Sequence, residues 1–198
     1  MPAAQPADRA ARKQRGAYYT PPELVDLLVE RTLADIDGHR SELGERVRVL
    51  DPACGDGRLL DAIGGRLRER RLGTELVGCD VDDAALVEAR ALGIDTVHGS
   101  ALDHDWGDER FDIVIGNPPY LSQMASSTTR GGSSRHGGGP YADAAAEFLA
   151  LSVELADPRH GRVALVLPQS ILASRDAAPI RDRVDRLADQ AWSWWSRD

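Results

Sequence analysis

A short apolar run that ends in two consecutive prolines limits most strongly what this chain can fold into. Residues 111–116 are apolar apart from one aspartate and predict a buried strand. Pro118 and Pro119 end that strand, because proline lacks the N–H that a sheet ladder requires. Open α/β sheets bind their ligands at the carboxyl ends of strands. The sequence therefore predicts a functional site at Asn117-Pro118-Pro119-Tyr120.

The groups of this tetrapeptide suit a planar amine. The fixed φ of the prolines predicts a rigid turn with outward-facing carbonyl oxygens beside the Asn117 amide. Asn117 and a neighbouring carbonyl can each accept one N–H, while Tyr120 can stack on an attached ring. The alternative is an ordinary strand-to-loop turn closed by prolines.

A second predicted turn, Pro52 to Gly57, joins an apolar strand to a helix. Its glycines allow the backbone to approach a ligand closely. Ala53 and Leu60 replace two glycines of the dinucleotide-binding pattern, which disfavours a phosphate ligand. Carboxylates at Asp51 and Asp56 instead favour a cation, such as a sulfonium or an ammonium group.

A third acidic position follows the next predicted strand, residues 75–78. Asp80 comes roughly 20 residues after the glycine turn, a spacing at which an acidic side chain binds ribose hydroxyls. The three turns together predict one site at the carboxyl edge of a parallel sheet.

Alternating strands and helices along the chain predict a doubly wound α/β domain with a mostly parallel sheet. Residues 190–195 predict a sixth strand that packs Trp192 and Trp194 into the core. The predicted strands are 47–51, 75–78, 94–98, 111–116 and 162–167, and the predicted helices are 21–36, 58–71, 82–91, 144–155 and 176–188.

Composition narrows the class of protein further. A chain of 198 residues with 42% hydrophobic content predicts one domain. No apolar run approaches the roughly 20 residues that span a bilayer, and no signal peptide opens the chain, so the cytoplasm is the expected location. The two cysteines follow strands and predict no disulfide framework. The five histidines lack metal-ligand spacing, so we expect no metal.

The net charge of -8 argues against a general nucleic-acid binder, although basic residues gather locally. Residues 1–15 form a basic leader that could contact DNA or remain a disordered arm. Residues 121–140 are rich in Gly and Ser and predict a flexible substrate loop, or else a plain linker.

These motifs occur in the order seen in S-adenosylmethionine-dependent adenine-N6 DNA methyltransferases, which the chain resembles over nearly its whole length. The likeness is greatest to the gamma arrangement of type I and type IIG restriction-modification methylases. Asn-Pro-Pro-Tyr also fits glutamine-N5 protein methyltransferases and RNA guanine-N2 enzymes, but those relatives usually lack the Tyr-Tyr-Thr-Pro segment. The motifs are Gly16-Ala17-Tyr18-Tyr19-Thr20-Pro21, Asp51-Pro52-Ala53-Cys54-Gly55-Asp56-Gly57, Asp80, Asp103 and Asn117-Pro118-Pro119-Tyr120.

The resemblance implies a class I, Rossmann-like methyltransferase domain over residues 16–198, strand order 3-2-1-4-5 and S-adenosylmethionine as cofactor. Asn117, Pro118, Pro119 and Tyr120 would be catalytic, with Asn117 also touching the cofactor. Asp80, beside Val81, would bind the ribose, and Asp103, beside Ala101 and Leu102, would bind the cofactor's adenine amine. The methionine end would be covered by Tyr18, Tyr19, Thr20 and Pro21, and the cofactor cradled by Asp51, Pro52, Ala53, Cys54, Gly55, Asp56 and Gly57.

The resemblance also implies a DNA substrate whose target adenine is flipped into the site. Compared with the family pattern, we expect this chain to be truncated inside its sixth strand and to have no target-recognition domain. It would then depend on a separate specificity or restriction subunit. Two alternatives stay open. One is a glutamine-N5 protein or RNA N-methyltransferase, and the other is a non-catalytic S-adenosylmethionine-binding remnant or subunit.

Overall fold

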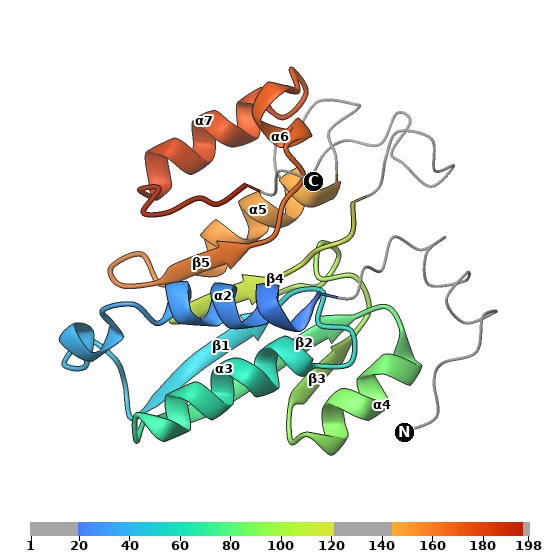
Figure 1. Cartoon of the computed structure of the whole chain (residues 1–198). Coiled ribbons are helices and arrows are strands. Elements are labelled where there is room, and N and C mark those ends of the chain that lie inside the picture. Colours follow the sequence, from blue (N-terminus) through green and yellow to red (C-terminus); the bar gives the residue numbers. More distant parts are fainter. Residues whose placement is uncertain (1–19, 121–143, 196–198) are drawn as a thin grey trace.

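The computed structural model describes residues 20–120 and 144–195. Within these ranges the chain forms one sheet with helices on both faces (Figure 1). The elements in chain order are α2 (Pro22–Thr32), η1 (Ile36–His39), β1 (Arg46–Asp51), α3 (Arg58–Glu69), β2 (Gly73–Asp80), α4 (Asp83–Ala91), β3 (Asp95–His98), β4 (Ile113–Gly116), α5 (Ala144–Leu155), β5 (Arg162–Leu165), α6 (Ser170–Ala173) and α7 (Ala178–Leu187).

The described sheet has five strands in the order β3-β2-β1-β4-β5, and every neighbouring pair is parallel. The prediction of a doubly wound parallel sheet in the order 3-2-1-4-5 is therefore confirmed. Between β1 and β4 the order of the chain reverses, and the adjacent carboxyl ends of strands at such a point form the crevice where open α/β sheets bind ligands.

Side-chain alternation along the strands divides the core into two faces. Val49 of β1 and Ile113 of β4 pack with α2, α3 and α4, while Leu50 and Val114 pack with α5. Figure 1 shows α2, α3 and α4 in front of the sheet and α5 behind it. A third cluster joins α5, α6 and α7 around Ile180. Burial on both faces explains why the strands read as continuous apolar runs.

The first predicted helix ends earlier than expected. α2 stops at Thr32, whose hydroxyl donates back to the Leu28 carbonyl oxygen at 2.7 Å. Asp35 then adopts a left-handed conformation with φ 60°, and a short 3-10 helix follows. A non-glycine residue in this conformation cannot continue an α-helix.

The predicted sixth strand is wrong. Residues 188–195 form no helix or strand, and Trp192 and Trp194 are 37% and 55% exposed instead of buried. The Arg31 guanidinium lies 5.6 Å from the centre of the Trp192 ring. Because this segment pairs with no strand of the described sheet, no neighbour holds its alternate side chains against the core.

Candidate active site

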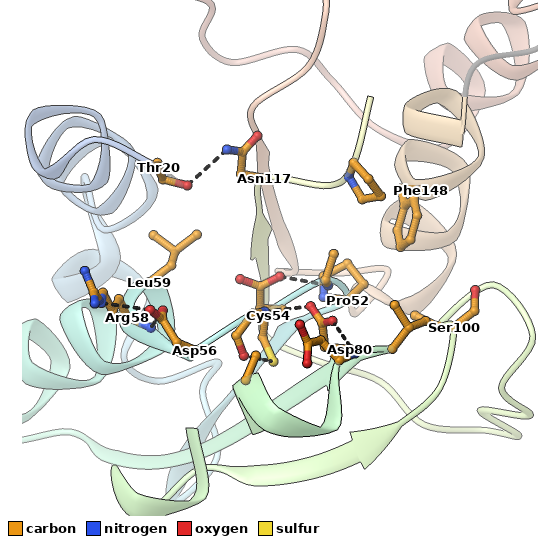
Figure 2. A pocket seen from close by; sticks show the side chains of 18 of the residues that line it. Thr20, Pro52, Cys54, Asp56, Arg58, Leu59, Asp80, Ser100, Asn117 and Phe148 are labelled. Carbon is orange, nitrogen blue, oxygen red and sulfur yellow. Dashed lines mark hydrogen bonds and ion pairs between the residues drawn. The ribbon is translucent and has the colours of Figure 1, made fainter. Parts of the chain in front are cut away.

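A cavity of about 370 Å³ opens at the carboxyl ends of the strands (Figure 2). Its walls come from the turns after β1, β2, β3 and β4, from the start of α2 and from α5. The residues that line it are Thr20, Val25, Asp51, Pro52, Ala53, Cys54, Gly55, Asp56, Arg58, Leu59, Asp80, Val81, Asp82, Ala85, Gly99, Ser100, Ala101, Leu102, Asn117, Pro119, Ala144 and Phe148.

The turn from Pro52 to Gly57 is held tightly against β2. The Cys54 N–H donates to the Cys79 carbonyl oxygen at 2.9 Å. A Cβ atom placed on Gly78 would lie 2.6 Å from Cys54 Sγ, so only glycine allows this approach. Gly57 adopts φ 81° immediately before α3, which turns the chain from the cavity floor into the helix.

Asp51 is a buried carboxyl group in the cavity wall, with 2% of its surface exposed. Its Oδ1 accepts the Ala53 N–H at 3.0 Å. The pKa of Asp51 is raised to about 7, mainly by burial and to a smaller extent by the nearby charge of Asp80, while the Ala53 hydrogen bond acts in the opposite direction. A cationic group beside Asp51 would favour the ionised form.

Asp80 fixes the backbone around it while facing the cavity. Its Oδ2 accepts the Gly55 N–H at 2.7 Å, and its Oδ1 accepts the Asp82 N–H at 2.9 Å. Because each carboxylate oxygen can accept more than one hydrogen bond, both can still accept from a ligand. Asp80 thus joins the turns that follow β1 and β2.

The Asn117 side chain projects from the end of β4 and is held at both ends of its amide. Its Nδ2 donates to Thr20 Oγ1 at 3.0 Å, and the Tyr120 hydroxyl donates to its Oδ1 at 2.7 Å. Figure 2 shows the amide nitrogen turned toward Thr20. Tyr120 packs against the cluster that joins α5, α6 and α7. These contacts connect the tetrapeptide to both ends of the described chain.

Most of the residues predicted for the site lie in the cavity wall. Thirteen of them line it: Thr20, Asp51, Pro52, Ala53, Cys54, Gly55, Asp56, Asp80, Val81, Ala101, Leu102, Asn117 and Pro119. Pro21, Gly57, Asp103, Pro118 and Tyr120 are not among the lining residues. Tyr18 and Tyr19 lie outside the described residues, as do the basic leader and the Gly/Ser-rich loop. The roles predicted for all of these site residues, lining or not, stay predictions.

Sequence reasoning missed two large side chains in the wall. Arg58, at the start of α3, pairs through Nε with Asp56 Oδ2 at 2.9 Å. Phe148 of α5 is only 6% exposed and lines the side of the cavity opposite Arg58 (Figure 2). Proximity to Asp56 in the turn could have indicated Arg58, whereas Phe148 follows the ordinary apolar pattern of a core helix.

Charge in the cavity wall is mainly negative. The lining residues include Asp51, Asp56, Asp80 and Asp82, against one guanidinium at Arg58. This balance favours a ligand that carries positive charge. Among the described residues there is no group of three or more His, Cys, Asp or Glu that could hold a metal ion, and no helix long and apolar enough to cross a membrane.

A model of the N-6 DNA Methylase family matches residues 5–185. The chain belongs to this family. A curated relative, a type II methyltransferase (M.BanIII) of Aneurinibacillus aneurinilyticus, is 30% identical over 140 residues, which cover 60% of this chain and 24% of the relative. Two other curated type II methyltransferases are covered over 44% and 22% of their lengths. The chain thus spans less than half of the length of each of these relatives.

Solved structures show the fold class of this chain. A Listeria monocytogenes protein assigned to the class I S-adenosylmethionine-dependent methyltransferases matches with a TM-score of 0.63 and 17% identity, over 91% of this chain and 57% of that chain. The methyltransferase subunit of a type I restriction-modification system from Streptococcus thermophilus matches with a TM-score of 0.65 and 23% identity, over 84% and 38%. The fold is that of class I S-adenosylmethionine-dependent methyltransferases, as predicted.

Proposed function

We propose that this chain binds S-adenosylmethionine in the acidic cavity and transfers its methyl group to the N6 amine of adenine in DNA. The observation that carries the proposal is the position of the Asn117 amide, at the edge of a cavity whose wall holds four carboxylates. An acceptor for an amine and a receptor for a cation thus share one cavity. Family membership supports the same reaction.

The residues of the cavity fit the proposed cofactor. Asp80 takes the ribose hydroxyls, since its two oxygens can each accept a further hydrogen bond. The turn from Pro52 to Gly57 packs closely against β2, which leaves space in the cavity for the cofactor beside the backbone of the turn. Asp51 faces the positive charge of the cofactor. Apolar side chains, Phe148 among them, cover the attached ring. When bound, S-adenosylmethionine supplies a methyl group on a positively charged sulfur.

The tetrapeptide acts on the target amine. The N6 lone pair of adenine is delocalised into its ring, which makes the nitrogen a poor nucleophile. Hydrogen bonds from N6 to Asn117 Oδ1 and to the Pro118 carbonyl oxygen favour a pyramidal nitrogen and stabilise the positive charge that develops on it. No strong general base is required, because the methylated nitrogen releases its proton to solvent afterwards.

DNA is the proposed substrate, and the target base is flipped out of the duplex before it enters the cavity. Because the chain spans less than half of its curated relatives, target recognition is assigned to residues or a subunit beyond those described here. The similarity to a methyltransferase subunit of a restriction-modification system is compatible with a separate specificity subunit.

Single-turnover methylation tests this proposal. The chain, in excess over labelled S-adenosylmethionine, is offered an adenine-containing single-stranded DNA, an RNA of the same sequence and a glutamine-containing protein substrate. Single-stranded DNA removes the cost of base flipping, a few kcal/mol, so a slow reaction remains measurable. We expect label in the DNA. Label only in the RNA or the protein would replace the proposed substrate, and cofactor binding without transfer to any substrate would make the chain a non-catalytic binding subunit.

A further inference from the structure

Asn117 is the only asparagine in the chain, and two hydroxyl groups hold its amide from opposite ends. The amide nitrogen donates to Thr20 Oγ1 at 3.0 Å, and the Tyr120 hydroxyl donates to the amide oxygen at 2.7 Å. One of these partners precedes Asn117 by 97 residues, while the other follows it by three. We call these three hydrogen-bonded residues, Thr20, Asn117 and Tyr120, the clamp.

The chemistry of the two hydroxyls selects one orientation of the amide. Any hydroxyl can donate or accept a hydrogen bond, so their presence alone leaves the amide free to rotate by 180°. A phenol, with a pKa of about 10, is a much better donor than an aliphatic alcohol. The phenol therefore faces the amide oxygen, and the aliphatic hydroxyl faces the amide nitrogen. Exchanging the two amide ends would place the weaker donor opposite the oxygen.

Both hydroxyls are carried by backbone that is itself held in place. Thr20 directly precedes Pro21 and Pro22, and Pro21 caps α2 with φ -56°. Tyr120 follows two prolines and packs against the apolar cluster formed by α5, α6 and α7. Thr20 thus lies just before α2, and Tyr120 lies in the segment after β4. Because separate parts of the fold hold the two partners, the orientation of the amide is set before a substrate arrives.

We infer that Thr20 is a positioning residue that, together with Tyr120, orients the Asn117 amide so that the site selects an exocyclic amino group over a carbonyl. Tyr120 uses one of the two acceptor positions of Oδ1, which leaves the second for a substrate N–H. A carbonyl oxygen at the same place would meet another acceptor and be rejected. This inference deepens the proposed function and rests on it, because it concerns what the same turn accepts.

Hydrogen exchange of the Asn117 side-chain NH₂ group reports on the clamp and can be measured on the whole chain without cofactor or substrate. Since Asn117 is the only asparagine, labelling asparagine side chains with ¹⁵N gives a single NH₂ pair in the NMR spectrum. Thr20→Val keeps the shape but removes the acceptor, and Thr20→Ser keeps the hydroxyl. We expect the bonded proton to exchange with water about three- to tenfold faster in Thr20→Val than in the wild type, and Thr20→Ser to restore slow exchange. Unchanged exchange in Thr20→Val, or no rescue by serine, would overturn the inference.

Selection is measured with adenosine and inosine, which differ in having an amino group or a carbonyl at C6. Saturating S-adenosylhomocysteine keeps both nucleosides out of the cofactor position. We expect adenosine to shift the Asn117 resonance at concentrations about tenfold lower than inosine, and Thr20→Val to lose most of this difference. Equal responses in the wild type would contradict the selection. The exchange measurement needs no reaction, so an intact clamp in a chain that does not methylate DNA would overturn the proposed function alone.

Discussion

Asp80 combines a structural and a ligand-binding position in one side chain. It accepts the N–H groups of Gly55 and Asp82 and lines the cavity. Hydrogen bonds to a charged group contribute about 1.5 to 3 kcal/mol, so Asp80→Ala is expected to weaken S-adenosylmethionine binding by about tenfold or more. Calorimetric titration measures the loss. Asp83→Ala, an exposed aspartate on α4 outside the cavity wall, is the control. A folded Asp80→Ala variant with wild-type affinity would remove this residue from the site.

The two cysteines are expected to be unreactive in the folded chain. Both are buried, and burial raises the pKa of Cys79 to about 12 and that of Cys54 still higher, with the charges of Asp51 and Asp80 acting in the same direction. Because the thiolate is the reactive form, a thiol reagent at pH 8 should label the folded chain at least about 100-fold more slowly than the urea-unfolded chain. Rapid labelling of either thiol in the folded chain would contradict the described burial.

Site residues at the end of a strand or in the turn after it could be predicted from sequence. Asp51 ends β1, Gly55 lies in the turn after it, and Asn117 directly follows β4, where a parallel sheet brings distant segments together. Phe148 could not be predicted, because its place in the cavity wall depends on how α5 packs behind the sheet. The same applies to the Thr20–Asn117 hydrogen bond, which joins residues 97 positions apart.

The junction between the β1 turn and α3 depends on Gly57. It has φ 81°, and an added Cβ would lie 2.6 Å from the Ile94 side chain. Gly57→Ala is expected to lower the free energy of unfolding by about 1 to 3 kcal/mol, since strain and steric overlap add. Gly65→Ala is the control within the same helix, where a Cβ would meet nothing within 4 Å. That substitution should stabilise by up to about 1 kcal/mol. Equal changes in the free energy of unfolding for Gly57→Ala and Gly65→Ala, measured by thermal unfolding, would show that Gly57 is not required at this junction.

Elements with a strong local pattern were predicted well, and those that depend on a partner were not. α5 has the predicted bounds, Ala144–Leu155, because its run of Ala and Leu favours a helix in any apolar setting. The four-residue α6 has too few residues to show a period. The segment 188–195 has alternating tryptophans but no strand beside it in the described structure, and alternation alone does not bury a side chain.

Asp51 gives the whole molecule a defined dependence of stability on pH. Its pKa rises from an ordinary 3.8 to about 7 on folding, so between these values the folded state holds a proton that the unfolded state has lost. Stability therefore falls as pH rises from about 4 to 7 and changes little above that. Relative to Asp51→Asn, the wild type should lose up to about 4 kcal/mol across this window.

Urea unfolding of the wild type and Asp51→Asn at pH 5, 6, 7 and 8 checks this dependence. Asp61→Asn is the control, because Asp61 is exposed on α3. Stability curves of the wild type and Asp51→Asn that run parallel over the whole range would show that Asp51 ionises as it does in the unfolded chain.

At the scale of the whole molecule, alternating strands and helices predict a parallel sheet but not the order of its strands. Right-handed crossovers are compatible with several orders, and the order β3-β2-β1-β4-β5 followed from the resemblance to methyltransferases. The order matters for function, because placing β1 beside β4 brings Asp51 and Asn117 to the same cavity.

The most direct test of the proposed reaction is nucleoside analysis of DNA after a single turnover with the wild type and with Asn117→Ala. We expect N6-methyladenine as the labelled product of the wild type. For Asn117→Ala we expect about 100-fold slower formation of N6-methyladenine with nearly unchanged affinity for S-adenosylmethionine, because a hydrogen bond of the transition state is lost. Methyl label on any other base or position, or equal N6-methyladenine formation by both proteins, would contradict the proposed reaction.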